Sequence, residues 1–159
     1  WFILGRAYAG ASRTEPSVQA YEAALVRDPS YRSEEVVISD LVSAVADSNS
    51  ERAKRVIVEQ LGPLAGPSLV LKAKAQEDIY RWELVKLAET VGAGTSLDYP
   101  AIAHADWTFA EGCAEQRRAL QKLAEYFGRA AVDELATQRG NKCLEPALSQ
   151  ALTKLQTTR

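Results

Sequence analysis

The chain has 159 residues, of which 47% are hydrophobic and 25% charged, so it can bury a sizeable core and is unlike a disordered chain or a disulfide-dense secreted module. The formal net charge of −2 does not favour a nucleic-acid partner, and no apolar run reaches the roughly 18 residues that a membrane span needs. One histidine and two cysteines leave most metal and nucleophile sites short of side chains, so we expect no catalytic residue, no metal and no cofactor.

A helical spacing of apolar residues runs through the chain from its first residue. It predicts longer helices over residues 1–12, 15–28, 33–46, 50–61, 77–91, 114–127 and 143–156, and shorter ones over 64–75, 97–104 and 129–137. Ser33 is the expected N-cap of the third helix, with Glu34 and Glu35 in its first turn. Strand-type alternation is almost absent, so we expect an all-α fold.

Three of the predicted helices end at a glycine, and these glycines mark a repeat. Gly62, Gly92 and Gly128 are separated by 30 and 36 residues, and each suits the positive φ that often follows a helix. Counted back from each glycine, positions 1, 4, 5 and 8 should form one apolar face. The face consists of Leu61, Val58, Ile57 and Lys54, then Val91, Ala88, Leu87 and Leu84, then Phe127, Ala124, Leu123 and Leu120. Repeats of this length predict a right-handed superhelical solenoid of antiparallel helix pairs.

The segment from Glu77 to Arg81, followed by the helix that ends at Gly92, resembles a short bacterial HEAT-type repeat. That pattern has an aspartate turn, an apolar residue, an arginine and then a helix. Asp47 supplies a similar turn before the first unit. The resemblance implies HEAT-like repeats over residues 32–159, and it implies that Arg81 pairs with Asp78 or Asp47.

The first 31 residues resemble one tetratricopeptide repeat. All eight signature offsets of that family are occupied by a consensus, near-consensus or small residue: Trp1, Leu4, Gly5, Tyr8, Ser17, Tyr21, Ala24 and Pro29. The resemblance implies that small residues such as Gly5 let two antiparallel helices approach closely. Because the chain opens as the interior of a helix, we expect a fragment of a longer protein. The combination resembles the C-terminal region of large bacterial signalling proteins such as serine/threonine kinases.

The helix faces opposite the apolar stripe carry the candidate binding residues. Position 10 before each glycine holds Arg52, Trp82 or Arg118, and Lys86 lies on the same expected face, as do Val56 and Val85. Trp82 beside arginines has the composition of an interface hot spot, so Trp82, Arg52, Lys86 and Arg118 are predicted to bind a protein or peptide. The alternatives are a solvated face of mixed charge, since Glu59, Glu89 and Glu125 lie on it, and a loop that covers Trp82.

The N-terminal helix offers a second candidate surface. By resemblance to the tetratricopeptide repeat, Phe2 and Arg6 lie on its partner-facing side, although Phe2 could pack against a further repeat instead. Trp1, Phe2 and Leu4 are expected to form an apolar edge that could mediate self-association.

Cys113 and Cys143 lie 30 residues apart, about one repeat, and each precedes a helix of the same type. A disulfide between them is possible, and two free thiols are the alternative. The expected compartment is the cytoplasm, or the periplasm if the disulfide forms. A metal or acid–base role for His104 with Asp106 has weak support, because the ligands are few and come from one segment.

The repeats and the lack of a set of catalytic residues predict a non-enzymatic scaffold for protein–protein interaction. We expect it to be part of a larger bacterial signalling protein. One alternative is an enzyme on a HEAT-like fold, similar to some DNA glycosylases or bilin lyases, with Asp106, Trp107 and the arginines in the site. The other alternative is a structural dimerisation module.

Overall fold

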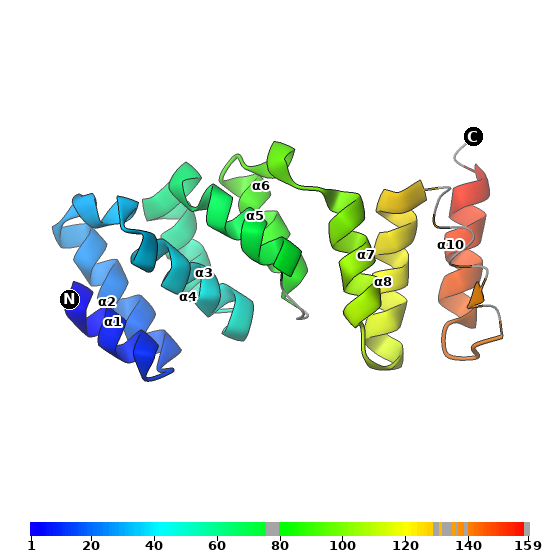
Figure 1. Cartoon of the computed structure of the whole chain (residues 1–159), viewed down its shortest axis with the longest axis horizontal. Coiled ribbons are helices and arrows are strands. Elements are labelled where there is room, and N and C mark those ends of the chain that lie inside the picture. The colour runs from blue at the N-terminus through cyan, green and yellow to red at the C-terminus, as the bar shows by residue number, and fades with distance from the viewer. Residues whose placement is uncertain (76–79, 129–130, 132–134, 136, 139, 158–159) are drawn as a thin grey trace. The chain divides into compact units, whose positions relative to one another are not determined.

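A computed structural model describes residues 1–75, 80–128, 131, 135, 137–138 and 140–157 of the chain. Every regular element among these residues is helical, which confirms the all-α prediction. The chain divides into two compact units, Trp1–Leu97 and Asp98–Arg159, and each is described by itself (Figure 1). Within the described residues, no helix is long and apolar enough to cross a membrane.

Among its described residues, the first unit has six α-helices and four short helical segments. Its elements are α1 (Phe2–Gly10), α2 (Thr14–Arg27), η1 (Pro29–Ser33), α3 (Glu35–Ser48), α4 (Glu51–Val56), the π-helical η2 (Ile57–Leu61), η3 (Gly62–Ala65), α5 (Gly66–Ala75), α6 (Arg81–Thr90) and η4 (Gly94–Ser96). The described helices of the second unit are α7 (Tyr99–Phe109), α8 (Gly112–Phe127) and α10 (Glu145–Thr157).

Helices α1 and α2 form an antiparallel pair that is held by one very close approach. The Ser17 hydroxyl of α2 donates a 2.9 Å hydrogen bond to the Gly5 carbonyl of α1. The buried Tyr21 ring lies directly against Gly5, where an added Cβ would come within 2.7 Å of the ring. Farther along α2, the Arg27 guanidinium lies over the Trp1 ring. Successive residues of α2 therefore contact successively earlier residues of α1, so the two helices are antiparallel. The lack of a side chain at Gly5 permits the close contact, as predicted.

The remaining helices of the first unit pack around α3, which contacts α2, α4, α5 and α6. Its Val37, Leu41 and Val45 are fully buried. Ser50 caps α4 by accepting a hydrogen bond from the Ala53 amide, and its own hydroxyl donates to Glu15 of α2 at 2.6 Å. This side chain therefore fixes the start of α4 against the preceding helix pair.

The glycines that mark the repeat have the expected backbone conformation. Gly62, Gly92 and Gly128 have φ values of 55°, 85° and 56°. The apolar face counted back from them is largely buried, but Val58 is 40% exposed and Phe127 is half-buried. Val58 lies in η2, where the helix widens to a π-turn and no longer follows the 3.6-residue period.

Several predicted boundaries were wrong for local reasons. Ser33 does not cap α3, because it closes the 3₁₀ segment η1 and donates to the Ser30 carbonyl instead. Asp47 lies in the last turn of α3, and the turn that follows is made by Asn49 with a positive φ and by Ser50. Helix α7 begins at Tyr99, after the Asp98 cap, and runs past residue 104 to Phe109. Most of the helix predicted over 129–137, and residues 77–79, lie outside the described residues.

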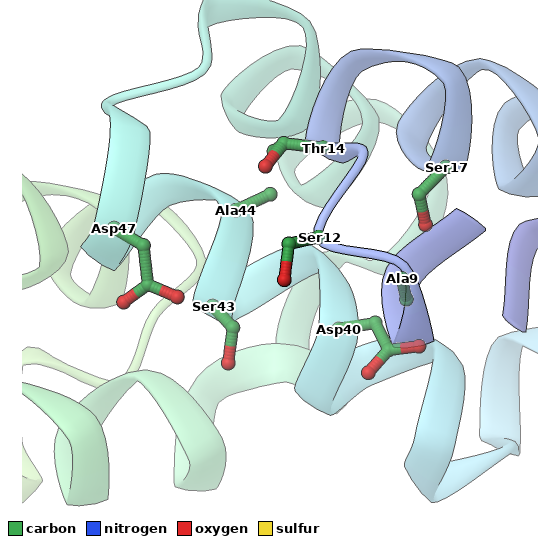
Figure 2. A pocket seen from close by; sticks show the side chains of 8 residues that line it. All are labelled: Ala9, Ser12, Thr14, Ser17, Asp40, Ser43, Ala44 and Asp47. Atoms are coloured by element: carbon green, nitrogen blue, oxygen red, sulfur yellow. The ribbon is translucent and has the colours of Figure 1, made fainter. Parts of the chain in front are cut away.

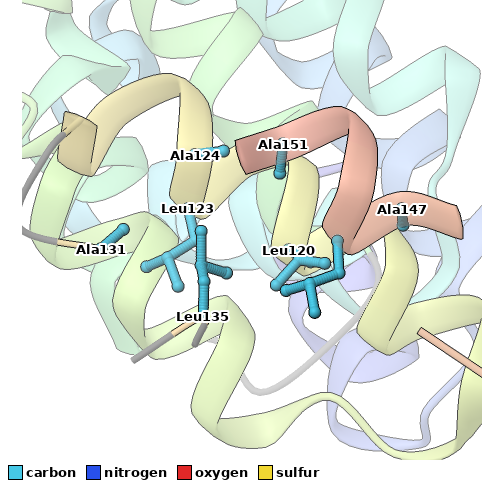
Figure 3. Packing of buried hydrophobic residues seen from close by; sticks show 8 residues of the cluster. Leu120, Leu123, Ala124, Ala131, Leu135, Ala147 and Ala151 are labelled. Carbon is cyan, nitrogen blue, oxygen red and sulfur yellow. The ribbon is translucent and has the colours of Figure 1, made fainter. Parts of the chain in front are cut away.

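In the second unit, α7, α8 and α10 pack around a small core (Figure 3). Tyr99, at the start of α7, stacks on Tyr126 near the end of α8 with ring centroids 5.0 Å apart, so these two helices are antiparallel. The buried cluster consists of Leu120, Leu123, Ala124, Ala131, Leu135, Ala147, Leu148 and Ala151, with Trp107 packed against it. Half of these eight residues are alanines, so the helices lie close together but bury little apolar area per residue.

The close approach at Gly5 gives a direct test of the first helix pair. Gly5→Ala should lower the melting temperature by several degrees, because a methyl group would overlap the Tyr21 ring and overpacking costs about 1–3 kcal/mol. Gly10→Ala, in the same helix with open space around it, is the matched control and should leave the melting temperature unchanged or slightly higher. Equal melting temperatures for the two variants in thermal denaturation would contradict this packing.

Candidate functional site

The binding residues predicted from the sequence lie on helices of both units. Arg52 is on α4, Trp82 and Lys86 are on α6, and Arg118 is on α8 in the second unit. Trp82 is half-buried, whereas Lys86 and Arg118 are exposed. The four predicted residues are thus divided between the two compact units. Arg52, Trp82 and Lys86 lie in the first unit, and Arg118 lies in the second.

In the first unit, the charges around these residues pair with one another across neighbouring helices. Arg52 and Arg55 of α4 approach Glu22 of α2 at 3.5 and 3.7 Å. Lys54 of α4 contacts Glu51 at 2.8 Å and Glu83 of α6 at 3.1 Å. Lys86 in turn contacts Glu83 at 2.7 Å. These pairs, which we call the ion-pair ladder, join α2 to α4 and α4 to α6.

Lys54 interrupts the predicted apolar face because it serves this ladder. Its side chain is only 14% exposed, and it reaches out to two carboxylates. Burial lowers the pKa of the Lys54 ammonium, but the hydrogen bonds to Glu51 and Glu83 outweigh burial, and the pKa is raised overall. The hydrogen bond from Lys86, and then that from Lys54, holds the pKa of Glu83 below its ordinary value.

Two residues expected on the solvated face are instead core. Val56 and Val85 are 1% and 2% exposed. The reason is that α4 contacts both α2 and α3, while α6 contacts both α3 and α5. Each helix is therefore covered on two sides, and its apolar arc is wider than the four positions that the repeat predicted.

On α1, Phe2 is half-buried and stacks on Tyr31 with centroids 4.8 Å apart and planes 8° apart. It also lies 6.4 Å from Tyr21, so its ring takes part in packing within the unit. Arg6 is exposed. Next to them, Trp1, Ile3 and Leu4 are 55%, 80% and 39% exposed. The predicted exposure of Trp1 and Leu4 is confirmed, whereas Phe2 packs inside the unit and Ile3 takes its place in the apolar edge.

A hollow that the sequence analysis did not anticipate lies between the α1–α2 turn and α3 (Figure 2). It has a volume of about 320 Å³. Its lining consists of Ala9, Ser12, Thr14, Ser17, Asp40, Ser43, Ala44 and Asp47. Six of these eight side chains are polar and two are carboxylates, while no lysine, arginine or histidine is among them.

One carboxylate of the hollow is held in place from the core. The Tyr21 hydroxyl donates a hydrogen bond to Asp40. Burial, followed by this hydrogen bond and the charge of Asp40, raises the pKa of Tyr21 well above its ordinary value, while the charge of Arg6 opposes the shift. Tyr21 therefore stays protonated in the physiological range and remains a donor, so it fixes the Asp40 carboxylate at the hollow.

Four other polar side chains of the hollow have no partner within the described part of the chain. Among the described residues, Ser12, Thr14, Ser43 and Asp47 have no side-chain hydrogen bond or ion pair. A signal for the hollow is visible in α3, where Asp40, Ser43 and Asp47 are spaced by three and four residues and form a polar stripe. A cationic group that entered the hollow would meet two carboxylates and several hydroxyl oxygens.

The remaining candidates from the sequence are His104, Arg81 and the two cysteines. His104 is exposed on α7, with its ring 6.0 Å from that of Phe127. Within the described part of the chain, no group of three or more histidine, cysteine or acidic side chains is placed to hold a metal ion. Arg81 is buried, at 1% exposure, and the predicted pair with Asp47, which is also a described residue, does not form. Asp78 lies outside the described residues, so the pairing with Asp78 stays a prediction. Cys113 and Cys143 are joined by a disulfide, with Cα atoms 5.8 Å apart.

Comparison with known proteins adds no family to this description. No family model matches the chain, and neither the curated proteins nor the solved structures contain a significant match.

The ion-pair ladder predicts a pH-dependent stability. Because the pKa of Glu83 is lowered in the folded state, its contribution is present above the ordinary value of 4.5 and is lost as the pH falls through the folded value. Glu83→Gln should therefore lower the free energy of unfolding by about 0.5–1 kcal/mol at pH 7, after discounting for solvent screening, and by much less near pH 3.

Glu59→Gln is the matched control, because Glu59 is exposed and makes no such contact. It should show no pH-dependent difference in urea denaturation followed by circular dichroism. If Glu83→Gln lowered the free energy of unfolding equally at both pH values, the ion-pair ladder would be ruled out as the source of the loss.

Proposed function

We propose that this chain is a non-enzymatic scaffold for protein–protein interaction. In this proposal, a tetratricopeptide-like unit over residues 1–31 continues into HEAT-like helix pairs over residues 32–159, stacked as a right-handed superhelix. The antiparallel α1–α2 pair, its close contact at Gly5 and the glycine-terminated helices support this reading. The chain would form part of a larger bacterial signalling protein.

The hollow between the α1–α2 turn and α3 is the observation that carries the proposal. Its unused hydroxyls and the free Asp47 carboxylate are exposed or half-buried, so they are available to a partner. The volume lies at the small end of the range found for ligand pockets. Two carboxylates without a basic side chain in the lining favour a positively charged group, so the proposed partner is a peptide segment that contains lysine or arginine.

The surface around Trp82, Arg52, Lys54 and Lys86, which we call the Trp82 ridge, is a weaker candidate for the same function. Arg52, Lys54 and Lys86 there are each paired with a glutamate. A partner would have to replace these pairs, whereas Ser12, Thr14, Ser43 and Asp47 in the hollow have none to replace. Trp82 itself is half-buried, and in this proposal it serves at most as a flanking contact.

For localisation, the disulfide supports the periplasmic alternative over the cytoplasmic one. Disulfides persist in oxidising compartments and are rare in the cytosol of most bacteria.

A peptide titration followed by amide NMR tests the binding proposal. The probe is an acetylated Gly-Lys-Gly-Arg-Gly-Lys-Gly amide, with the same peptide carrying glutamate at the three charged positions as its counterpart. The basic peptide should shift the amides of Ala9, Ser12, Ser43 and Ala44, and the acidic one should not. Asp40→Asn/Asp47→Asn should weaken binding at least about tenfold, since two ionic contacts are lost.

Glu34→Gln/Glu59→Gln removes the same charge from exposed sites outside the hollow and should leave binding nearly unchanged. Arg6→Gln should strengthen binding, because it removes a positive charge that acts on Tyr21, the residue whose hydroxyl donates to Asp40. Equal weakening by both acidic double variants would reduce the interaction to nonspecific attraction. Weakening by Arg6→Gln would return Arg6 to the role predicted from the sequence.

The dimerisation alternative is favoured by the exposed apolar edge formed by Trp1, Ile3 and Leu4. If this edge mediates self-association, the chain should dimerise in sedimentation equilibrium at about 100 μM, and Ile3→Lys should shift it to monomer. Leu71→Lys is the matched control, because Leu71 is 71% exposed on α5, away from the edge. A monomer at all concentrations, or a dimer that Ile3→Lys leaves intact, would exclude the edge as an interface.

A further inference from the structure

The second unit contains a disulfide whose position suggests control of its last helix. Cys113 lies in the first turn of α8, and Cys143 lies just before α10 begins at Glu145. The disulfide therefore ties the start of one helix to the start of the other. We propose that it is a redox-controlled latch, which keeps α10 docked on α8 when oxidised and releases α10 when reduced.

Among the described residues, a hydrogen bond and a small apolar cluster also hold α10 on α8. The Nε of Arg117, one turn after Cys113, donates a 2.7 Å hydrogen bond to the Cys143 carbonyl. Beyond it, α10 contributes Ala147, Leu148 and Ala151 to the buried cluster on α8 (Figure 3). Two of these three buried residues are alanines, which bury little apolar surface, and Leu152 and Leu155 of α10 pack against the cluster while only partly buried. A helix with so few fully buried side chains opens more easily when it is not tethered.

The tether is also within reach of a reductant. Cys113 is exposed and Cys143 is half-buried, although the helices that they join pack on a buried core. Structural disulfides that only stabilise a core are commonly enclosed, whereas accessible ones are more easily reduced. The latch thus combines an accessible disulfide with a helix that depends on it.

The reductant is a dithiol, and the exchange balances without another reactant. One thiolate of the dithiol attacks a sulfur of the cystine, the S–S bond breaks, and the other cysteine leaves as a thiolate that takes up a proton. The second thiolate of the dithiol then attacks the mixed disulfide and displaces the remaining cysteine. The dithiol ends as a disulfide, and Cys113 and Cys143 end as two thiols, a transfer of two electrons.

Release of α10 would uncover the apolar side of α8 at Leu120, Leu123 and Ala124. The Arg117 hydrogen bond alone cannot replace a covalent link, because a single hydrogen bond contributes little net stability in water. The reduced chain therefore alternates between docked and undocked α10. This proposal is independent of the hollow in the first unit.

Hydrogen exchange followed by mass spectrometry tests the latch on the full chain, with and without dithiothreitol and with thiol counting in both samples. On reduction, the amides in peptides that cover α10, and those in peptides from the part of α8 that packs against it, should exchange at least tenfold faster. Peptides from α2 and α3 should be unchanged, which excludes global unfolding. Cys113→Ser/Cys143→Ser should exchange like the reduced wild type, and dithiothreitol should have no further effect on it.

Two results would overturn the proposal. One is an α10 exchange rate that stays the same while thiol counting shows two new thiols. The other is a pair of free thiols in air-oxidised protein, because the disulfide would then not form. If the double serine variant failed to fold, the reduction experiment on the wild type would still decide between release and continued docking.

Discussion

The contact between the Tyr21 ring and the Gly5 backbone links the packing of the first unit to its candidate site. The ring occupies the space that a side chain on α1 would otherwise take, so α1 and α2 can lie close together. The same tyrosine extends its hydroxyl to Asp40 of α3 and so connects a third helix to the pair. This arrangement matters because these helices are 9 and 14 residues long, and helices of such length are marginal on their own in water.

The sequence predicted the helical fold well because the spacing of apolar residues and the helix-ending glycines are local signals. Leu84, Leu87 and Ala88 are buried as expected, and Gly92 follows their helix with a positive φ. The errors arose where tertiary contacts decide. Val56 and Val85 became core because their helices have neighbours on two sides, and no pattern within one helix records how many neighbours it has.

The candidate site was less predictable than the fold, again for a physical reason. A hollow depends on where the α1–α2 turn passes α3, which brings Ser12 beside residues some 30 positions later in the chain. The stripe of Asp40, Ser43 and Asp47 is visible in the sequence, but a polar stripe alone is typical of any solvent-facing helix. Lys54 was visible in the sequence as a charged residue on an otherwise apolar face. Its role became clear only from the structure, where it forms an ion pair with Glu83 of α6.

The central claim is that a cationic side chain of a partner enters the hollow rather than docking on the Trp82 ridge. Intermolecular nuclear Overhauser effects between a bound lysine-containing peptide and the protein distinguish the two surfaces most directly. The account predicts contacts from the lysine ε-methylene protons to the methyl groups of Ala9 and Ala44, which line the hollow. Contacts to the Trp82 indole protons, with none to Ala9 or Ala44, would contradict it.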